Sequence, residues 1–244
     1  MTTGQLTVGI VTPHEAPGPE IELPAMTNGR IATVVSRTGP ELRASTTAAA
    51  IDGAAASFAG HDLVAVVHAS TTTAYVIGHD EEAALVERLS QRFQVPAVAS
   101  CATVVAALRA YGIERVQLVH PPWFVDAFDE LGAAYFRGLG FDAVVTKAVT
   151  LPDDPARVER QHVVDWVEQH VADRVEAIFF AGNGFRTADA VEELERRTGR
   201  LVVSANQALL WGILCATRTT WDLTGHGRLL HTSPQTNDSN QLQS

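Results

Sequence analysis

The chain has 244 residues, of which 46% are hydrophobic and 19% charged, and its formal net charge at pH 7 is −10. This composition is typical of a globular protein and excludes a chain that is disordered throughout. The negative charge argues against a nucleic-acid-binding protein, because no cationic field would gather phosphates.

The sequence predicts a cytoplasmic protein without a membrane span. No apolar run approaches the ~18 residues that cross a bilayer, and the first ten residues lack the pattern of a signal peptide. The two cysteines, Cys101 and Cys215, cannot form a disulfide framework and fit a reducing compartment. Both are expected to serve in packing.

Short apolar, β-branched runs alternate with longer amphipathic segments. The runs predict strands at residues 6–12, 30–36, 62–69, 95–100, 115–120, 141–149, 176–182 and 200–205. Helical periodicity predicts helices at residues 81–93, 123–139, 158–173 and 187–198, the last with Thr187 as its N-cap. Because the runs are continuously apolar, the strands are expected to be buried on both faces of parallel sheets. This order indicates an α/β fold with right-handed crossovers.

An internal repeat runs through the chain, since each part reads strand, polar turn, helix, strand, small polar turn, helix. We therefore predict two similar flavodoxin-like (Rossmann-like) halves with parallel sheets, related by a pseudo-twofold axis. The first spans residues 1–112 and the second 113–204, and segment 205–231 is a candidate to pack back on the first half. The polar tail 232–244 is expected to be disordered. Ligands bind beyond the carboxyl ends of such strands, so the predicted site is the cleft between the halves.

Two polar turns carry the candidate chemistry, at residues 68–73 and 182–187. Hydroxyls and free backbone N–H groups after a buried strand form a nest for a carboxylate or an oxyanion. The alternatives are an N-cap role for Ser70 and, for the second turn, a tight strand–helix connection. Arg186 is a candidate partner for a substrate carboxylate, or else a cap of the neighbouring turn. The candidate binding residues are Thr71, Thr72, Gly182, Asn183, Gly184 and Arg186.

Three histidines lie at predicted strand ends, where they suit acid–base chemistry near neutral pH: His14, His68 and His120. The alternative for each is a hydrogen-bonded structural residue. No spacing of histidines and carboxylates resembles a metal site, and no phosphate-binding glycine motif is present. We therefore expect neither a metal nor a cofactor.

At these turns the sequence resembles the aspartate/glutamate racemase superfamily, in its maleate cis–trans isomerase and arylmalonate decarboxylase branch. The resemblance rests on GNGFRT at residues 182–187, VSANQ at 203–207 and ASTTTAYVIG at 69–78, and it extends over nearly the whole folded chain. It implies a two-half α/β fold, a small-molecule substrate held in the cleft, and a homo-oligomer.

The sequence departs from that family where its chemistry resides. The resemblance places one cysteine in each half, but these positions hold Ser70 and Gly182 here. The family's Pro-Ser-Ser-Asn stretch reads Pro-His-Glu-Ala around His14, and its Pro-Tyr reads Pro-Trp at Trp123. Trp123 is a candidate pocket residue that would favour an aromatic or heterocyclic substrate, or else a packing residue at the start of a helix.

These residues suggest a cysteine-independent enzyme acting on a small carbonyl or carboxylate compound. Ser70 would be the nucleophile or would position a water, and His68, His14 or His120 would be the base. That set suits hydrolysis, or decarboxylation through a stabilised oxyanion or enediolate. The alternatives are a maleate isomerase-like cis–trans isomerase and a non-catalytic protein that binds a small acid.

Overall fold

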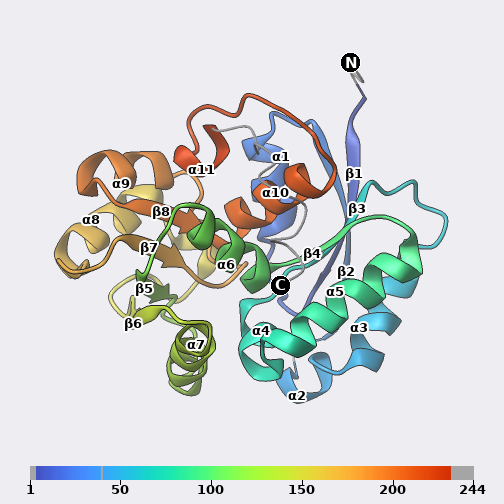
Figure 1. The fold of residues 1–244 in the computed structure, drawn as a ribbon, viewed down its shortest axis with the longest axis horizontal. Coiled ribbons are helices and arrows are strands. Elements are labelled where there is room, and N and C mark those ends of the chain that lie inside the picture. Colours follow the sequence, from blue (N-terminus) through green and yellow to red (C-terminus); the bar gives the residue numbers. More distant parts are fainter. Residues whose placement is uncertain (1–3, 40, 232–244) are drawn as a thin grey trace.

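A computed structural model describes residues 4–39 and 41–231, apart from the side chains of residues 42 and 43. Within this range the strands form two four-stranded parallel sheets, which lie side by side (Figure 1). The first has the order β2-β1-β3-β4 and the second β6-β5-β7-β8. The strands are β1 (Leu6–Thr12), β2 (Ile31–Arg37), β3 (Ala65–His68), β4 (Ala97–Ala99), β5 (Arg115–His120), β6 (Asp142–Lys147), β7 (Ala177–Phe180) and β8 (Leu201–Ser204). The shared order confirms the predicted fold of two similar α/β halves.

The helices connect and cover these strands. They are α1 (Pro19–Met26), α2 (Leu42–Ser45), α3 (Ala48–Ala55), α4 (Thr71–Ile77), α5 (His79–Phe93), α6 (Ser100–Ala110), α7 (Ala127–Gly138), α8 (Arg160–His170), α9 (Val191–Thr198), α10 (Ala205–Ala216) and α11 (Arg228–His231), with short 3-10 turns at Ala56–Phe58 and Pro155–Arg157. The tail 232–244, for which we predict disorder, lies outside the described residues.

Two predicted helix starts are wrong. The helix predicted from residue 187 begins at Val191, and the Thr187 carbonyl instead accepts from the Ala190 N–H in a preceding turn. Thr187 is therefore not the N-cap. The helix predicted from residue 123 begins at Ala127, because a turn closed by Pro121 comes first. Trp123 thus lies in a connection rather than on a helix.

Residues alternate between the two faces of each strand and so build two layers of core against each sheet. On the first sheet, Ile10 faces α1 and α10, and Val66 faces α3 and α5. On the second sheet, Phe179 faces α6 and α7, and Phe180 faces α8 and α9. The inner strands β1, β3, β5 and β7 are therefore buried on both sides, as continuous apolar runs predict, whereas the edge strands β2 and β6 are mostly half-buried.

The two halves exchange their last helices. Helix α6 follows β4 of the first sheet, yet its Val104 and Leu108 pack against β5 and β7 of the second. Helix α10 follows β8 of the second sheet, yet its Leu209 and Ile213 pack against β1 and β3 of the first. The two helices lie together at the centre of the molecule (Figure 1). A methyl group at Gly212 of α10 would lie only 2.4 Å from Thr103 Cγ2 of α6.

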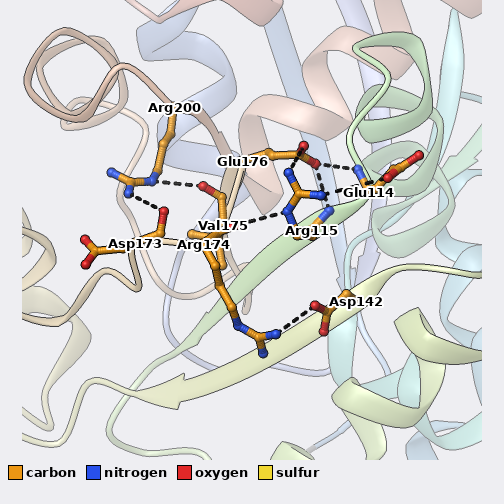
Figure 2. A network of polar contacts seen from close by, with 8 residues as sticks. All are labelled: Glu114, Arg115, Asp142, Asp173, Arg174, Val175, Glu176 and Arg200. Carbon is orange, nitrogen blue, oxygen red and sulfur yellow. Dashed lines mark hydrogen bonds and ion pairs between the residues drawn. The ribbon is translucent and has the colours of Figure 1, made fainter.

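A polar network ties the amino ends of the second sheet together, at the edge opposite the predicted site (Figure 2). Glu176 accepts from the backbone N–H groups of Glu114 and Arg115 at 2.8 and 3.0 Å and pairs with the Arg115 side chain. Arg174 pairs with Asp142 at 2.9 Å. Exposed pairs of this kind contribute ~0–1 kcal/mol each, so the network mainly fixes strand ends.

The helix contact at Gly212 gives a test of the central packing. We expect Gly212→Ala to lower the free energy of unfolding by about 1–3 kcal/mol through overpacking. Thr103→Ser removes the methyl group in the way and keeps the hydroxyl that donates to Ala99, so it should restore most of the loss. Urea unfolding measures both.

Gly53→Ala is the matched control, because this glycine lies exposed in α3 with no atom within 4 Å of a new methyl group. It should stabilise by about 0.5–1 kcal/mol. Equal effects at both glycines would contradict the packing argument.

Candidate active site

The two predicted turns meet across the boundary between the halves. One follows β3 and the other follows β7, each at the carboxyl end of its strand. The backbone N–H of Gly182 donates to Thr71 Oγ1 at 3.0 Å. Gly182 has φ of +92°, a conformation that favours glycine, and it directs this N–H across the boundary. The contact joins the start of α4 to the second sheet.

Ser70 is the N-cap of α4. Its Oγ accepts from the N–H and the hydroxyl of Thr73 at 3.1 and 2.8 Å, and it lies 3.2 Å from Thr72 Oγ1. No histidine among the described residues forms a hydrogen bond with Ser70 that would activate it. The N-cap alternative is therefore realised, and the nucleophile role stays a prediction. Thr72 is the more exposed of these hydroxyls.

Asn183 is engaged by neighbours from both halves. Ser100 Oγ donates to its Oδ1 and its Nδ2 donates to Asn206 Oδ1, both at 2.9 Å. Asn206 Nδ2 donates in turn to the Asn183 carbonyl at 2.9 Å and to Glu22 Oε2 at 2.7 Å. The Asn183 side chain therefore holds the turn in shape, and any anion at this turn must use backbone N–H groups.

His14 is the histidine that lies beside both turns. Its Nε2 is 3.1 Å from the carbonyl oxygen of Ala69, and its Nδ1 would lie 3.4 Å from a methyl group at Gly184. Gly18, at the end of the same loop, allows the loop to lie directly against the second turn, because a Cβ at Gly18 would lie 1.9 Å from the Asn183 carbonyl oxygen. Burial lowers the pKa of His14 to about 4, opposed by Glu20 and aided by Arg37.

His68 lies on the face of β3 that Val66 shares, which packs against α3 and α5. Burial lowers its pKa to about 4, and the nearby charges of His14 and Arg88 lower it further. Within the described part of the chain, neither ring nitrogen has a hydrogen-bond partner. This isolation does not support its predicted role as the base for Ser70.

His120 is the centre of a separate buried relay. Its Nδ1 lies 2.7 Å from Asp129 Oδ1 and its Nε2 lies 3.3 Å from the Tyr75 hydroxyl. Lys147 lies 3.7 Å from the other Asp129 oxygen. Burial lowers the pKa of His120, against the hydrogen bond and charge of Asp129 that raise it. The structure thus places His120 apart from His14 and His68, whose charges interact.

Aromatic rings border the second turn. A Cβ at Gly182 would lie 3.1 Å from Phe124 Cζ, so this ring occupies the place of a side chain there. Trp123 packs edge-on against Phe185 with ring centroids 5.5 Å apart, and it stays a candidate lining residue. Arg186 is half-buried and donates to the Pro155 carbonyl at 3.4 Å.

The turns are closed to solvent. Thr71 is 1% and Asn183 0% exposed. Two surface hollows, of about 450 and 1290 Å³, lie elsewhere, the first beside Trp166 and the second along α5 and α6. The half-buried loop at His14 and the connection at Phe124 cover the turns. A ligand at the turns would therefore lie against these two segments.

Neither cysteine is placed as a nucleophile. Cys101 Sγ lies 3.9 Å from the Thr71 carbonyl oxygen, and burial raises the pKa of its thiol well above the usual value. Cys215 lies in α10, and burial raises its pKa to about 12. In residues 4–39 and 41–231 no group of three potential metal ligands is present, and no helix there is long and apolar enough to span a membrane.

Four residues that shape these sites were not predicted from the sequence: Glu22, Ser100, and the two partners of His120, Tyr75 and Asp129. Asn206 lies in the VSANQ stretch that carries the resemblance, so a signal for it was present. Glu22 had no such signal, because only the fold brings α1 against α10.

Solved structures share this architecture over nearly their full length. An arylmalonate decarboxylase superposes with a TM-score of 0.79 at 24% identity, covering 92% of this chain and 98% of the other. The maleate isomerase of Pseudomonas putida S16 gives 0.81 at 21% identity, with 93% and 99% covered. The Nocardia farcinica maleate cis–trans isomerase gives 0.81 at 23% identity, with 93% and 98% covered. The chain therefore has the fold of the decarboxylase and maleate isomerase class.

A family profile described as arylmalonate decarboxylase matches residues 43–230. The chain belongs to the arylmalonate decarboxylase family, which confirms the branch that the sequence resembles. A comparison with curated proteins finds no match.

The isolated His68 predicts a pH dependence of stability. Its folded pKa lies below the ordinary value of 6.5, so stability is complete above that pH and is lost as the pH falls toward 4. Between pH 7 and 4.5 this loss is roughly 2 kcal/mol. Urea unfolding at both pH values measures the loss. In His68→Leu the free energy of unfolding should fall by roughly 2 kcal/mol less between pH 7 and 4.5 than it does in the wild type.

His61→Gln is the control, because His61 is exposed and the pH dependence should stay as in the wild type. Other buried groups are common to all three proteins, and the difference reports His68 together with its interaction with His14. An unchanged loss in His68→Leu would mean that other groups govern acid destabilisation.

Proposed function

We propose that this protein is a cofactor-independent enzyme that decarboxylates a small compound carrying two carboxylates on one carbon, of the arylmalonate type. Its family supports action on a small carboxylate. The observation that carries the proposal is the hydrogen bond from Gly182 N–H to Thr71 Oγ1. It brings the two turns together beside His14, so charge-stabilising groups and a proton carrier share one place.

The turns would stabilise the charge that develops during decarboxylation. The bond between the central carbon and one carboxylate breaks, and CO₂ leaves. The electron pair of that bond stays with the central carbon and is delocalised onto the remaining carboxylate as an enediolate. The N-terminus of α4, with the Thr72 hydroxyl at its edge, offers donors to these oxygens. Removing one such donor from an oxyanion site costs ~10²–10³-fold in rate.

His14 would deliver the proton to the resulting carbanion. With its pKa at about 4, the free protein holds His14 neutral at pH 7. A bound carboxylate next to the ring raises that pKa, because the opposite charge favours the imidazolium. Substrate binding would thus draw one proton from solvent onto His14, and this proton passes to carbon after CO₂ leaves.

This mechanism uses neither a thiol nor a serine nucleophile. Ser70 is occupied as an N-cap without a base beside it, so hydrolysis through an acyl-serine finds no support. The role of Ser70 is to orient the first turn of α4. Assembly into a homo-oligomer, which the resemblance implies, stays a prediction.

Phenylmalonate in D₂O tests the proposal by proton NMR. We expect phenylacetate with one deuterium on its α carbon. His14→Gln should lower the rate by about 10²–10⁴-fold, the usual worth of a general acid, and His61→Gln should leave it unchanged.

A parallel sample with maleate separates the other functions. If maleate is converted to fumarate and phenylmalonate is not consumed, the protein is an isomerase and the proposed decarboxylation is wrong. Thermal stabilisation by either diacid with no product would indicate a binding protein instead.

A further inference from the structure

We infer that Glu22 of α1 is a positioning residue, which holds the turn at Gly182–Thr187 in shape only as an ionised carboxylate. The inference deepens the proposed function, because this turn belongs to the same candidate site. Glu22 does not touch the place that a substrate would occupy. It would act through Asn206 and through the backbone that follows the turn.

Both Glu22 oxygens are used as acceptors. Oε1 accepts from the Ala188 N–H at 2.8 Å and Oε2 from Asn206 Nδ2 at 2.7 Å. Glu22 is only 7% exposed, so water cannot readily replace a lost partner. Protonation would set an O–H donor against one of these N–H donors, and the geometry therefore matches the carboxylate alone.

The contact reaches the site through two short paths. The Asn206 side chain contacts Asn183 twice: its Oδ1 accepts from Asn183 Nδ2, and its Nδ2 donates to the Asn183 backbone carbonyl. Ala188 lies at the other end of the same turn. Losing either Glu22 contact leaves a buried donor unsatisfied, which is unfavourable. The turn would relax, and Gly182 and Gly184 would move relative to His14.

The surroundings allow Glu22 to change its protonation near neutral pH. Burial raises its pKa to about 7, and the hydrogen bonds from Asn206 and Ala188 oppose that rise. On the neighbouring turn, Asp189 adds to the rise and Arg186 counters it. On α1 itself, Glu20 is paired with Arg37. Helix α10 presents the Asn206 amide, and its one titratable side chain, Cys215, lies near its far end.

The test follows the backbone amide of Gly184 by ¹⁵N NMR of the full chain between pH 5.5 and 8.5. In the wild type this signal should titrate with a midpoint near 7. In Glu22→Gln it should stay at its low-pH position throughout, because the amide sets a donor against a donor. Glu22→Asp keeps an ionisable group with a shorter reach, so the titration should persist with a smaller amplitude.

Glu82→Gln is the matched control. Glu82 is a second buried glutamate whose pKa burial raises to about 7, but it accepts from the Cys101 N–H and from Tyr135 instead. The Gly184 titration should survive this change. A Gly184 signal that still titrates in Glu22→Gln, or that rests at its high-pH position, would overturn the inference.

Turnover of phenylmalonate gives an independent readout. The ratio of wild-type kcat to Glu22→Gln kcat should rise from near one at pH 6 to about tenfold at pH 8, as expected for one lost hydrogen bond. The titration of His14 occurs in both proteins and cancels in this ratio. If phenylmalonate is not consumed but the Gly184 titration depends on Glu22, the proposed function fails and the positioning role stands. If turnover depends on pH equally in both proteins, the positioning role fails alone.

Discussion

The close crossing of α6 and α10 is the constraint on which the rest of the molecule depends. Each helix leaves its own half and buries its apolar face on the sheet of the other, so neither half can complete its core alone. Gly212 sets the separation of the two helices against Thr103. Because both helices begin at strand ends beside the candidate site, that separation also fixes the distance between the two turns.

A buried polar network lies at this crossing and connects the packed helices to the second turn of the candidate site. Ser100 begins α6, Asn206 lies in the first turn of α10, and both hold Asn183. Glu22 closes the network from α1. Such groups are costly to bury unless every partner is satisfied, so they rigidify the turn that they surround. The polar groups at the opposite edge of the second sheet are largely exposed and lie at the amino ends of its strands, away from the two turns (Figure 2).

Much of the architecture could be predicted from sequence, because buried parallel strands are continuous apolar runs and the repeat indicates two halves. The site was harder to predict. His14, His68 and His120 look alike at strand ends, yet His14 lies in the loop after β1, His68 ends β3 of the first sheet and His120 ends β5 of the second. Ser70 reads equally well as a nucleophile or a cap, and only its bonds to Thr73 decide between the two local geometries. Helix α1, which supplies Glu22, contains an internal proline and little amphipathic pattern.

The ring of Phe124 against Gly182 has a consequence for substitutions at the two positions. The resemblance places a cysteine at position 182, but a side chain there meets both the ring and a backbone with φ of +92°. Replacing Phe124 alone would leave a void, and introducing the thiol alone would create a clash. Each change alone is therefore unfavourable, and the two positions are energetically coupled. A thiol at position 182 would need a compensating change at Phe124, so a double-mutant cycle at the two positions should show a coupling energy rather than additive effects.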